Sequence, residues 1–239
     1  MTSRFTNPLL VSLTSPADPK VQVLALPGAG TGPSAFSPWC GVVPPYWRLT
    51  SICLPGRGRR IGQPFLRSLP ECADQIAEAA KAELDEPLIL FGHSLGGLLA
   101  FEVARRIQVT AVLVAGVAPV ERPLDPGNIP EHAIQTHVRD LLRAAGVEDS
   151  PLQDELIGVT APILRNDMDM LLGYAQPEER LDCPIVAYYG TSDVIQPASW
   201  AHWTTGPATT VRYQGDHHAV QANARWFIDD IEHRYGSGW

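Results

Sequence analysis

PLILFGHSLGGLLAFEV, residues 87–103, is the segment that decides the fold of this chain. A short apolar run ends at Phe91, a serine between two glycines follows, and a helical pattern of apolar residues begins directly afterwards. The segment therefore predicts a strand, a sharp turn with Ser94 at its apex, and a helix. Gly92 and Gly96 suit such a turn, because a Cβ atom at either position would collide with the neighbouring strand or helix.

A serine in this setting is typical of the nucleophile elbow of α/β-hydrolases. The strained turn lifts the Ser94 hydroxyl clear of the sheet, and the amino terminus of the next helix stabilises negative charge on a reacting oxygen. Gly-x-Ser-x-Gly also occurs in plain glycine-rich turns, but the flanking strand and helix favour the elbow. The elbow requires an acid and then a histidine, each after a late strand.

The rest of the chain alternates between short apolar runs and amphipathic helical patterns, which indicates a mainly parallel sheet flanked by helices. The runs 9–13 and 21–26 are separated by a proline-containing turn, so we expect them to form an antiparallel opening pair. The other predicted strands span 47–54, 87–91, 110–117, 184–189 and 209–214, and the predicted helices span about 72–84, 95–107 and 218–235. We predict a single α/β-hydrolase domain over residues 1–239.

The alternation stops between residues 121 and 180, where only helical patterns occur. One helix is predicted over 131–144 and a second over 152–160. Pro162 suits the first turn of a helix and not its interior, so we expect a third helix from there to about Gly173. These helices have no strand to cover, so we interpret them as a lid rather than as an extension of the core. The candidates for lining an acyl pocket in this lid are Met168, Leu171 and Leu172.

Composition and charge narrow the class of protein. With 239 residues, 45% hydrophobic and 18% charged, the chain is ordinary for a soluble enzyme. A net charge of −8 argues against nucleic acid and against an anionic membrane surface. Cys53 and Cys183 are expected as free thiols in buried strands, and the cysteines have no metal-binding spacing. Without a signal peptide or a long apolar run, we expect a cytoplasmic protein. We also expect a monomer that needs no metal and no cofactor.

Asp193 is the predicted acid, because it follows the apolar run 185–190, a late strand. The alternative for this residue is an Asx-turn, since Ser-Asp after Gly is a common turn sequence. Glu121 and Asp125, which follow the preceding strand, are the second choices for the acid. Their proline-rich setting at the entrance to the lid makes them weaker candidates.

His217 is the predicted base, because it follows the last strand and lies in a loop. Its neighbour His218 is expected to open the final helix instead. Asp216 is a poor candidate for orienting the imidazole, because a residue adjacent in sequence cannot easily face Nδ1.

Two backbone N–H groups are the predicted oxyanion hole. Leu95, the residue after the nucleophile, supplies the first. Ala29 is the candidate for the second, because the small residues of the loop after the strand 21–26 let the backbone approach a substrate closely. A plain turn is the alternative for this loop. The arrangement predicts acyl transfer to Ser94 followed by hydrolysis, with Asp193 orienting His217.

The motifs of this chain resemble those of the stand-alone type II thioesterases that serve polyketide synthases and nonribosomal peptide synthetases. The likeness spans nearly the whole chain, and LPGRGRR is its most distinctive part. The matching segments are LPGAGTGPSAFSPW (26–39), LPGRGRR (54–60), FGHSLGGLLAFEVAR (91–105), PILRNDMDMLLGY (162–174), GTSD (190–193) and GDHH (215–218). The chain departs from the family at Gly28, at Leu95 and in the residues after His217. These departures affect the shape of the acyl pocket and remove no catalytic group.

The resemblance implies a substrate on the phosphopantetheine arm of an acyl or peptidyl carrier protein, from which stalled or wrong acyl groups are removed. Arg57, Arg59 and Arg60 are the candidates for meeting the phosphate or an acidic carrier. The alternative for these arginines is a solvated turn with local salt bridges. Since the chain itself is negatively charged, docking to an acidic carrier is expected to be weak and transient.

Three other functions fit the same fold. A small-molecule carboxylesterase or lipase shares the triad, but the segments 54–60 and 162–174 do not support it. A hydrolase-fold receptor commonly lacks a triad member, whereas all three are present here. An acyltransferase differs only in what enters the pocket second, which the sequence does not reveal.

Overall fold

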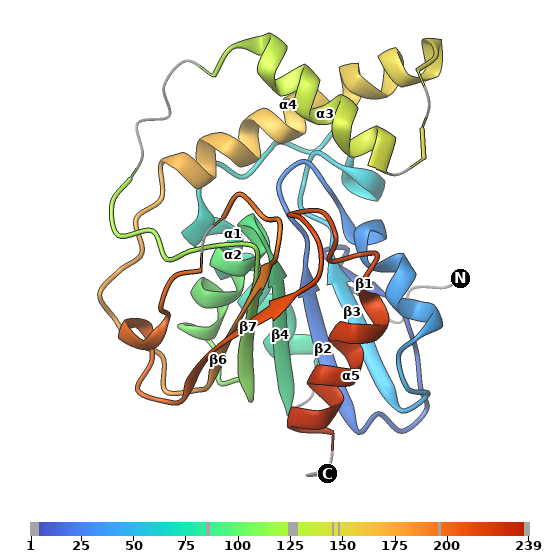
Figure 1. The fold of residues 1–239 in the computed structure, drawn as a ribbon. Helices are drawn as coiled ribbons and strands as arrows, with labels where there is room; N and C mark the ends of the chain where they lie inside the picture. Colours follow the sequence, from blue (N-terminus) through green and yellow to red (C-terminus); the bar gives the residue numbers. More distant parts are fainter. Residues whose placement is uncertain are drawn as a thin grey trace.

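A mainly parallel sheet forms the centre of the molecule (Figure 1). The computed structural model describes residues 5–84, 87–123, 129–144, 146–147, 149–195 and 197–236. Within them, the strands are β1 (Leu10–Ser12), β2 (Val21–Leu26), β3 (Trp47–Ile52), β4 (Leu88–His93), β5 (Ala111–Ala115), β6 (Ile185–Gly190) and β7 (Ala208–Tyr213). Their order across the sheet is β1-β3-β2-β4-β5-β6-β7, and every pair except β1 with β3 is parallel. The predicted sheet is confirmed.

Helices cover both faces of this sheet (Figure 1). On one face lie α1 (Leu69–Glu83) and α2 (Leu95–Ala104), and on the other lie α5 (Ala224–Tyr235) and the 3-10 segment η1 (Pro33–Gly41). All residues of β2, β4, β5 and β6 are buried. A strand covered on both faces has no solvent side, which explains why these runs are mostly apolar and show no polar alternation.

Two further helices, α3 (Glu131–Ala144) and α4 (Pro151–Leu172), lie above one end of the sheet (Figure 1). We call them the helical insertion. They pack against each other through a small cluster of buried side chains, namely Ile134, Val138, Ile157, Ala161 and Leu164. The half-buried Ala29 of the loop after β2 packs against the same cluster. The insertion therefore covers the carboxyl end of β2, which is the end where the site is expected.

One long helix stands where two were predicted, because α4 continues through Pro162. Ser150 caps the amino terminus of α4, because its side chain accepts a hydrogen bond from the Gln153 amide at 3.3 Å. Pro151 follows in the first turn. The buried face of α4 continues from Ile157 beyond the proline, and its packing against α3 outweighs the N–H that Pro162 lacks. The prediction of a third helix is therefore wrong.

The predicted antiparallel opening pair is also wrong. The first strand, β1, pairs antiparallel with β3, whereas β2 lies between β3 and β4 and is parallel to both. Burial explains the difference. All six residues of β2 are buried, as suits an interior strand, whereas only one residue of the three-residue β1 is buried, as suits an edge.

Cys53 and Cys183 are buried free thiols, as predicted. Each lies just outside a strand rather than within it, since β3 ends at Ile52 and β6 begins at Ile185. Among the described residues, no helix combines the length and the apolar character that crossing a membrane requires.

Candidate active site

Ser94 lies at the apex of the turn between β4 and α2, with φ 53° and ψ −120°. It is the only non-glycine residue with positive φ in the described part of the chain. A Cβ atom on Gly92 would lie 2.1 Å from the Gly96 carbonyl oxygen, and one on Gly96 would lie 2.0 Å from the Leu26 carbonyl oxygen. Because only glycine fits at both positions, β4 and α2 meet closely enough to hold Ser94 in this strained conformation.

His217 and Asp193 are in contact at the same edge of the sheet. The Nδ1 atom of His217 lies 3.2 Å from each carboxylate oxygen of Asp193. The Asp193 side chain is fully buried, and its Oδ1 also accepts a hydrogen bond from the Ile195 amide at 2.9 Å. Asp193 is therefore an Asx-turn residue and the partner of His217 at once, so the two interpretations of this residue are compatible. Of the second choices, Glu121 is exposed and Asp125 lies outside the described residues.

Gly116, directly after β5, supports this pair and was not singled out from the sequence. It has φ +62°, and a Cβ there would lie 3.1 Å from His217 Nδ1 and 3.2 Å from Asp193 Oδ2. Any side chain at this position would therefore press on the contact between imidazole and carboxylate. A glycine at the end of a strand adjacent to the elbow is the only sequence signal that could have indicated it.

His93, next to the predicted nucleophile Ser94, contacts the backbone of His217. Its Nε2 lies 2.8 Å from the His217 carbonyl oxygen, and because a carbonyl only accepts, Nε2 carries the proton. Burial, with a contribution from the nearby His217, lowers the pKa of His93 to about 3. This ring is therefore neutral at neutral pH and links the elbow to the loop that carries the predicted base.

His218 does not open the last helix, as was predicted. Residues 217–223 form turns, and α5 begins at Ala224. The His218 ring instead lies 6.0 Å from the ring of His137 in α3, measured between centroids. Burial and the neighbouring His217 lower the pKa of His218. The insertion thus contacts the residue adjacent to the predicted base.

The two predicted oxyanion donors come from the elbow itself and from the loop after β2. Leu95 is the first residue of α2, and Ala29 lies in the loop after β2. A Cβ on Gly28, the residue before Ala29, would lie 3.5 Å from Ser94 Cβ, so this loop lies close to Ser94. The Ala29 amide donates a hydrogen bond to no acceptor among the described residues. Its N–H is therefore free to bind a substrate oxygen.

Arg57 is not available to a carrier or its phosphate, which corrects the expectation for this residue. Its side chain is only 6% exposed and forms a bidentate ion pair with Asp167 of α4, at 2.7 and 2.6 Å. Its Nη1 also donates to the Thr31 carbonyl at 2.9 Å. The sequence did not indicate this pair, because the two residues are 110 positions apart along the chain.

Arg59 and Arg60 differ from Arg57, because neither forms an ion pair with another described residue. Arg59 is exposed and donates to the carbonyls of Pro8 and Leu10. Arg60 is half-buried and donates to the Cys53 carbonyl at 3.2 Å. Their charges are therefore not compensated by a nearby carboxylate.

The predicted acyl-pocket residues occupy different surroundings on α4. Met168 is half-buried and packs against the cluster that also contacts Ala29. Leu171 packs against the larger core cluster, which includes residues of α1 and α2, and Leu172 is half-buried at the end of the helix. Ala29 packs against both clusters, so Met168 and Leu171 each share a cluster with the loop of the predicted oxyanion hole.

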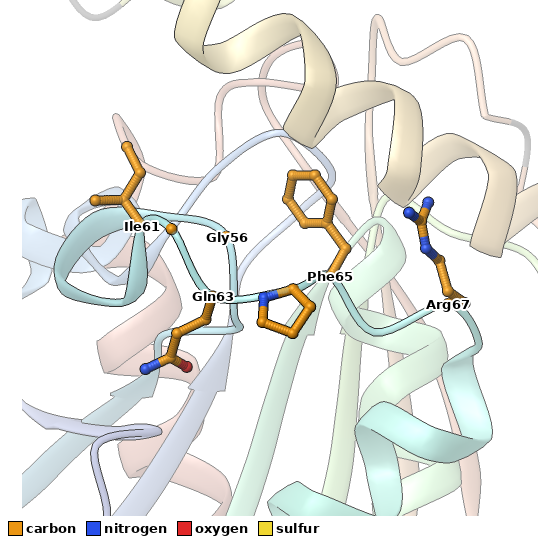
Figure 2. Close-up of a pocket in the computed structure, with 7 residues that line it drawn as sticks. Gly56, Ile61, Gln63, Phe65 and Arg67 are labelled. Atoms are coloured by element: carbon orange, nitrogen blue, oxygen red, sulfur yellow. The ribbon is translucent and has the colours of Figure 1, made fainter.

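A cavity of about 550 Å³ lies beside the loop that carries the arginines (Figure 2). Its walls are formed by Gly56, Ile61, Gly62, Gln63, Pro64, Phe65 and Arg67. Phe65 and Arg67 point toward α4, and Arg67 Nη1 donates to Asn166 Oδ1 of that helix at 3.1 Å. None of the predicted triad residues lines this cavity, so it is separate from Ser94.

Comparison with known proteins identifies the family. The model of the thioesterase domain matches residues 21–235. The chain is 31% identical to thioesterase TesA of Mycobacterium marinum over 92% of this chain and 94% of that protein. It is 28% identical to the gramicidin S biosynthesis protein GrsT of Aneurinibacillus migulanus, over 83% and 82% of the two chains. The structure of the type II thioesterase BorB from the borrelidin biosynthetic cluster superposes with a TM-score of 0.83 at 27% identity, covering 98% of each chain.

The fold and the family match define an α/β-hydrolase that cleaves thioesters. The chain belongs to the thioesterase family, and the resemblance to the type II thioesterases is confirmed.

Proposed function

We propose that this thioesterase hydrolyses acyl, aminoacyl or peptidyl groups from the phosphopantetheine arm of carrier proteins, and so removes stalled or aberrant intermediates of polyketide or nonribosomal peptide biosynthesis. The observation that carries the proposal is the contact of His217 with Asp193 at the sheet edge that bears the strained Ser94, within a thioesterase fold. The likeness to BorB and GrsT, which are named for such pathways, supports this substrate class.

In the first proposed step, His217 accepts the hydroxyl proton of Ser94, and the Ser94 oxygen attacks the thioester carbonyl carbon. The carbonyl π electrons move to the oxygen, where the amides of Leu95 and Ala29 stabilise the negative charge. When the intermediate collapses, the bond to sulfur breaks and the protonated His217 gives its proton to the departing pantetheine thiolate. The product of this step is an acyl ester of Ser94.

In the second proposed step, His217 removes a proton from water, and the resulting hydroxide attacks the acyl carbon. The bond to the Ser94 oxygen breaks, the proton returns to that oxygen, and the acid leaves. Asp193 orients the imidazole and stabilises its charged form during both steps. The steps need no metal and no cofactor, because the pantetheine arm belongs to the substrate.

The carrier protein is proposed to dock on the loop 56–67, which contains four arginines and no acidic residue. Arg59 and Arg60 supply uncompensated positive charge there, beside the exposed Ile61. Because the net charge of the chain is −8, we expect this attraction to act only at short range and docking to be transient. We expect the enzyme to act as a cytoplasmic monomer.

The test is hydrolysis of an acyl group from a loaded phosphopantetheinyl carrier protein, beside a p-nitrophenyl ester of the same acyl chain. We expect faster turnover on the carrier and loss of both activities in Ser94→Ala. In Arg59→Gln/Arg60→Gln we expect KM to rise for the carrier substrate and not for the ester, which isolates docking from chemistry.

Other outcomes would change the proposal in different ways. Good ester turnover without preference for the carrier would indicate a general carboxylesterase. Acyl transfer to an added alcohol or amine in place of water would indicate an acyltransferase. Inactivity on both substrates would favour a ligand-binding role.

A further inference from the structure

Asp167 is a buried carboxylate of α4 that the proposed mechanism does not use. Its side chain is 0% exposed, and both of its oxygens are engaged. Oδ1 accepts from Arg57 Nη2 at 2.6 Å, and Oδ2 accepts from Arg57 Nη1 at 2.7 Å and from the Gly30 amide at 2.8 Å. A carboxylate of the insertion is thus bonded directly to the backbone next to Ala29.

Arg57 extends this contact to the next residue of the loop. Its Nη1 donates to the Thr31 carbonyl at 2.9 Å. Thr31 in turn donates to the Gly28 carbonyl, through its amide at 3.2 Å and its hydroxyl at 2.7 Å. The backbone on the carboxyl side of Ala29 is therefore held by Asp167 and Arg57, while the Ala29 amide itself binds no acceptor among the described residues.

Packing brings α4 onto the same loop. Gly30 has φ +73°, and a Cβ there would lie 3.2 Å from Leu164 Cδ1 and 3.3 Å from Leu164 Cβ. Ala29 packs against the cluster that contains Leu164. The loop therefore rests on the insertion on one side and faces Ser94 on the other.

Stability alone does not account for the ion pair. The Arg57 Nε group is buried and has no partner among the described residues, so the pair is incompletely satisfied. Two apolar residues of similar volume commonly serve a buried position as well as an ion pair or better. What apolar residues cannot supply is an acceptor for the Gly30 amide and a donor for the Thr31 carbonyl.

We infer that Asp167, with Arg57, is a positioning residue for thioester hydrolysis: it holds the loop 28–31 so that the Ala29 N–H points at the developing oxyanion. The inference rests on the proposed function, because it assumes that Ala29 serves the oxyanion hole. It makes the insertion part of the catalytic geometry rather than a cover alone.

The experiment removes both charges at once, in Arg57→Met/Asp167→Leu, so that no unpaired charge is buried. The matched control is Glu131→Leu/Arg165→Met, which removes an ion pair of 2.9 Å between α3 and α4 that does not touch the loop. Activity on the p-nitrophenyl ester is measured as kcat and KM, because that substrate does not require carrier docking. Thermal unfolding shows whether each variant is folded.

A second readout tests the oxyanion hole without turnover. An alkyl trifluoromethyl ketone forms a hemiketal, in which the Ser94 oxygen bonds to the ketone carbon, the ketone oxygen takes the negative charge, and the Ser94 proton passes to His217. Its affinity depends on the oxyanion donors, whereas the affinity for the product carboxylic acid reports the acyl pocket.

In Arg57→Met/Asp167→Leu we expect kcat and trifluoromethyl ketone affinity to fall together by about 10- to 100-fold. This fall is at most near the effect of removing a whole oxyanion donor, because the Ala29 N–H is displaced but still present. KM and product affinity should stay within about twofold, as should all values in the control, whose ion pair is partly exposed. A folded Arg57→Met/Asp167→Leu variant with wild-type kcat and ketone affinity would overturn the inference.

Arg57→Lys covers the case in which the double variant does not fold. It keeps the charge opposite Asp167 but not the fork that reaches both Asp167 and Thr31. A several-fold fall in kcat and ketone affinity with unchanged product affinity supports the inference, and unchanged values overturn it. Failure of the proposed function is distinguishable, because the wild-type enzyme would then show no Ser94-dependent hydrolysis.

Discussion

The elbow and the helical insertion are held together by different kinds of interaction. At the elbow, backbone approaches backbone so closely that a Cβ on Gly92 or Gly96 would lie about 2 Å from a carbonyl oxygen. In the insertion, apolar side chains, the Arg57–Asp167 pair and the hydrogen bond from Arg67 to Asn166 contact the rest of the molecule. Ser94, the predicted nucleophile, is therefore held by close backbone contacts in the core, whereas the loop of Ala29 is held by side chains of the insertion.

This difference separates two parts of the chemistry. The position of Ser94 should be insensitive to changes in the insertion, because α2 and β4 are buried in the core. The oxyanion loop should respond to such changes, because Asp167 binds the Gly30 amide directly. The predictions below test this contrast, from the largest expected effect to the smallest.

Ser94→Gly should abolish activity and stabilise the fold. Removal of the nucleophile should lower kcat by about 10⁴- to 10⁶-fold. Because Ser94 has φ 53° and ψ −120°, a conformation that suits glycine, the free energy of unfolding should rise by about 1–2 kcal/mol. Carrier hydrolysis and urea unfolding measure the two effects. Ser192→Gly, in an exposed turn, is the control for added chain flexibility, and a lower unfolding free energy in Ser94→Gly would contradict the strain.

Gly96→Ala should break the elbow. The added Cβ would lie 2.0 Å from the Leu26 carbonyl oxygen, and backbone in the core cannot move away. We expect a loss of roughly 3 kcal/mol or more in the free energy of unfolding, or no soluble protein. Thermal unfolding and soluble yield give the result. Near-wild-type stability would mean that β2 and α2 adjust more easily than their packing indicates.

His93 should make the elbow sensitive to acid. Its pKa in the folded protein is about 3, below its ordinary value of 6.5. Between these values the unfolded chain binds a proton that the folded protein does not, so stability is lost as the pH falls below about 6.5. The loss is at most about 1.4 kcal/mol per pH unit.

The measurement for His93 is urea unfolding of wild type and His93→Gln at pH 7, 6 and 5. Glutamine carries a neutral N–H donor in place of Nε2 and does not titrate, so its stability should fall less steeply with decreasing pH. Parallel curves for the two proteins would show that His93 does not contribute to the pH dependence of stability.

Gly158→Ala tests the same type of substitution in the insertion, where we expect the opposite sign. Gly158 lies inside α4, and a Cβ there meets no atom within 4 Å. Alanine should therefore raise the free energy of unfolding by up to about 1 kcal/mol, as helix propensity predicts. Thermal unfolding beside Gly96→Ala provides the comparison. Destabilisation by Gly158→Ala would show that the helix needs glycine at this position, four residues before Pro162.

The sequence by itself determined the features that depend on neighbouring residues. The glycine spacing around Ser94 predicts the elbow, because the steric conflict at Gly92 is with the Gly96 carbonyl and so arises within a few residues of the turn. The continuous apolar runs predict interior strands, because burial on both faces removes any polar alternation. The order of acid and histidine after late strands followed from the elbow, and the structure brings His217 and Asp193 into contact.

Tertiary structure alone decided which distant segments meet. The partner of β1 is β3 rather than β2, because interior and edge positions are assigned by the whole sheet. The helix α4 passes through Pro162, because packing against α3 outweighs a local helix-breaking preference. Arg57 pairs with Asp167, which lies 110 positions further along the chain, and no local sequence pattern indicates this pairing. Local steric limits and periodicity depend on residues near one another in the sequence, and the sequence therefore predicts them. Contacts between remote segments form only when the folded core brings those segments together.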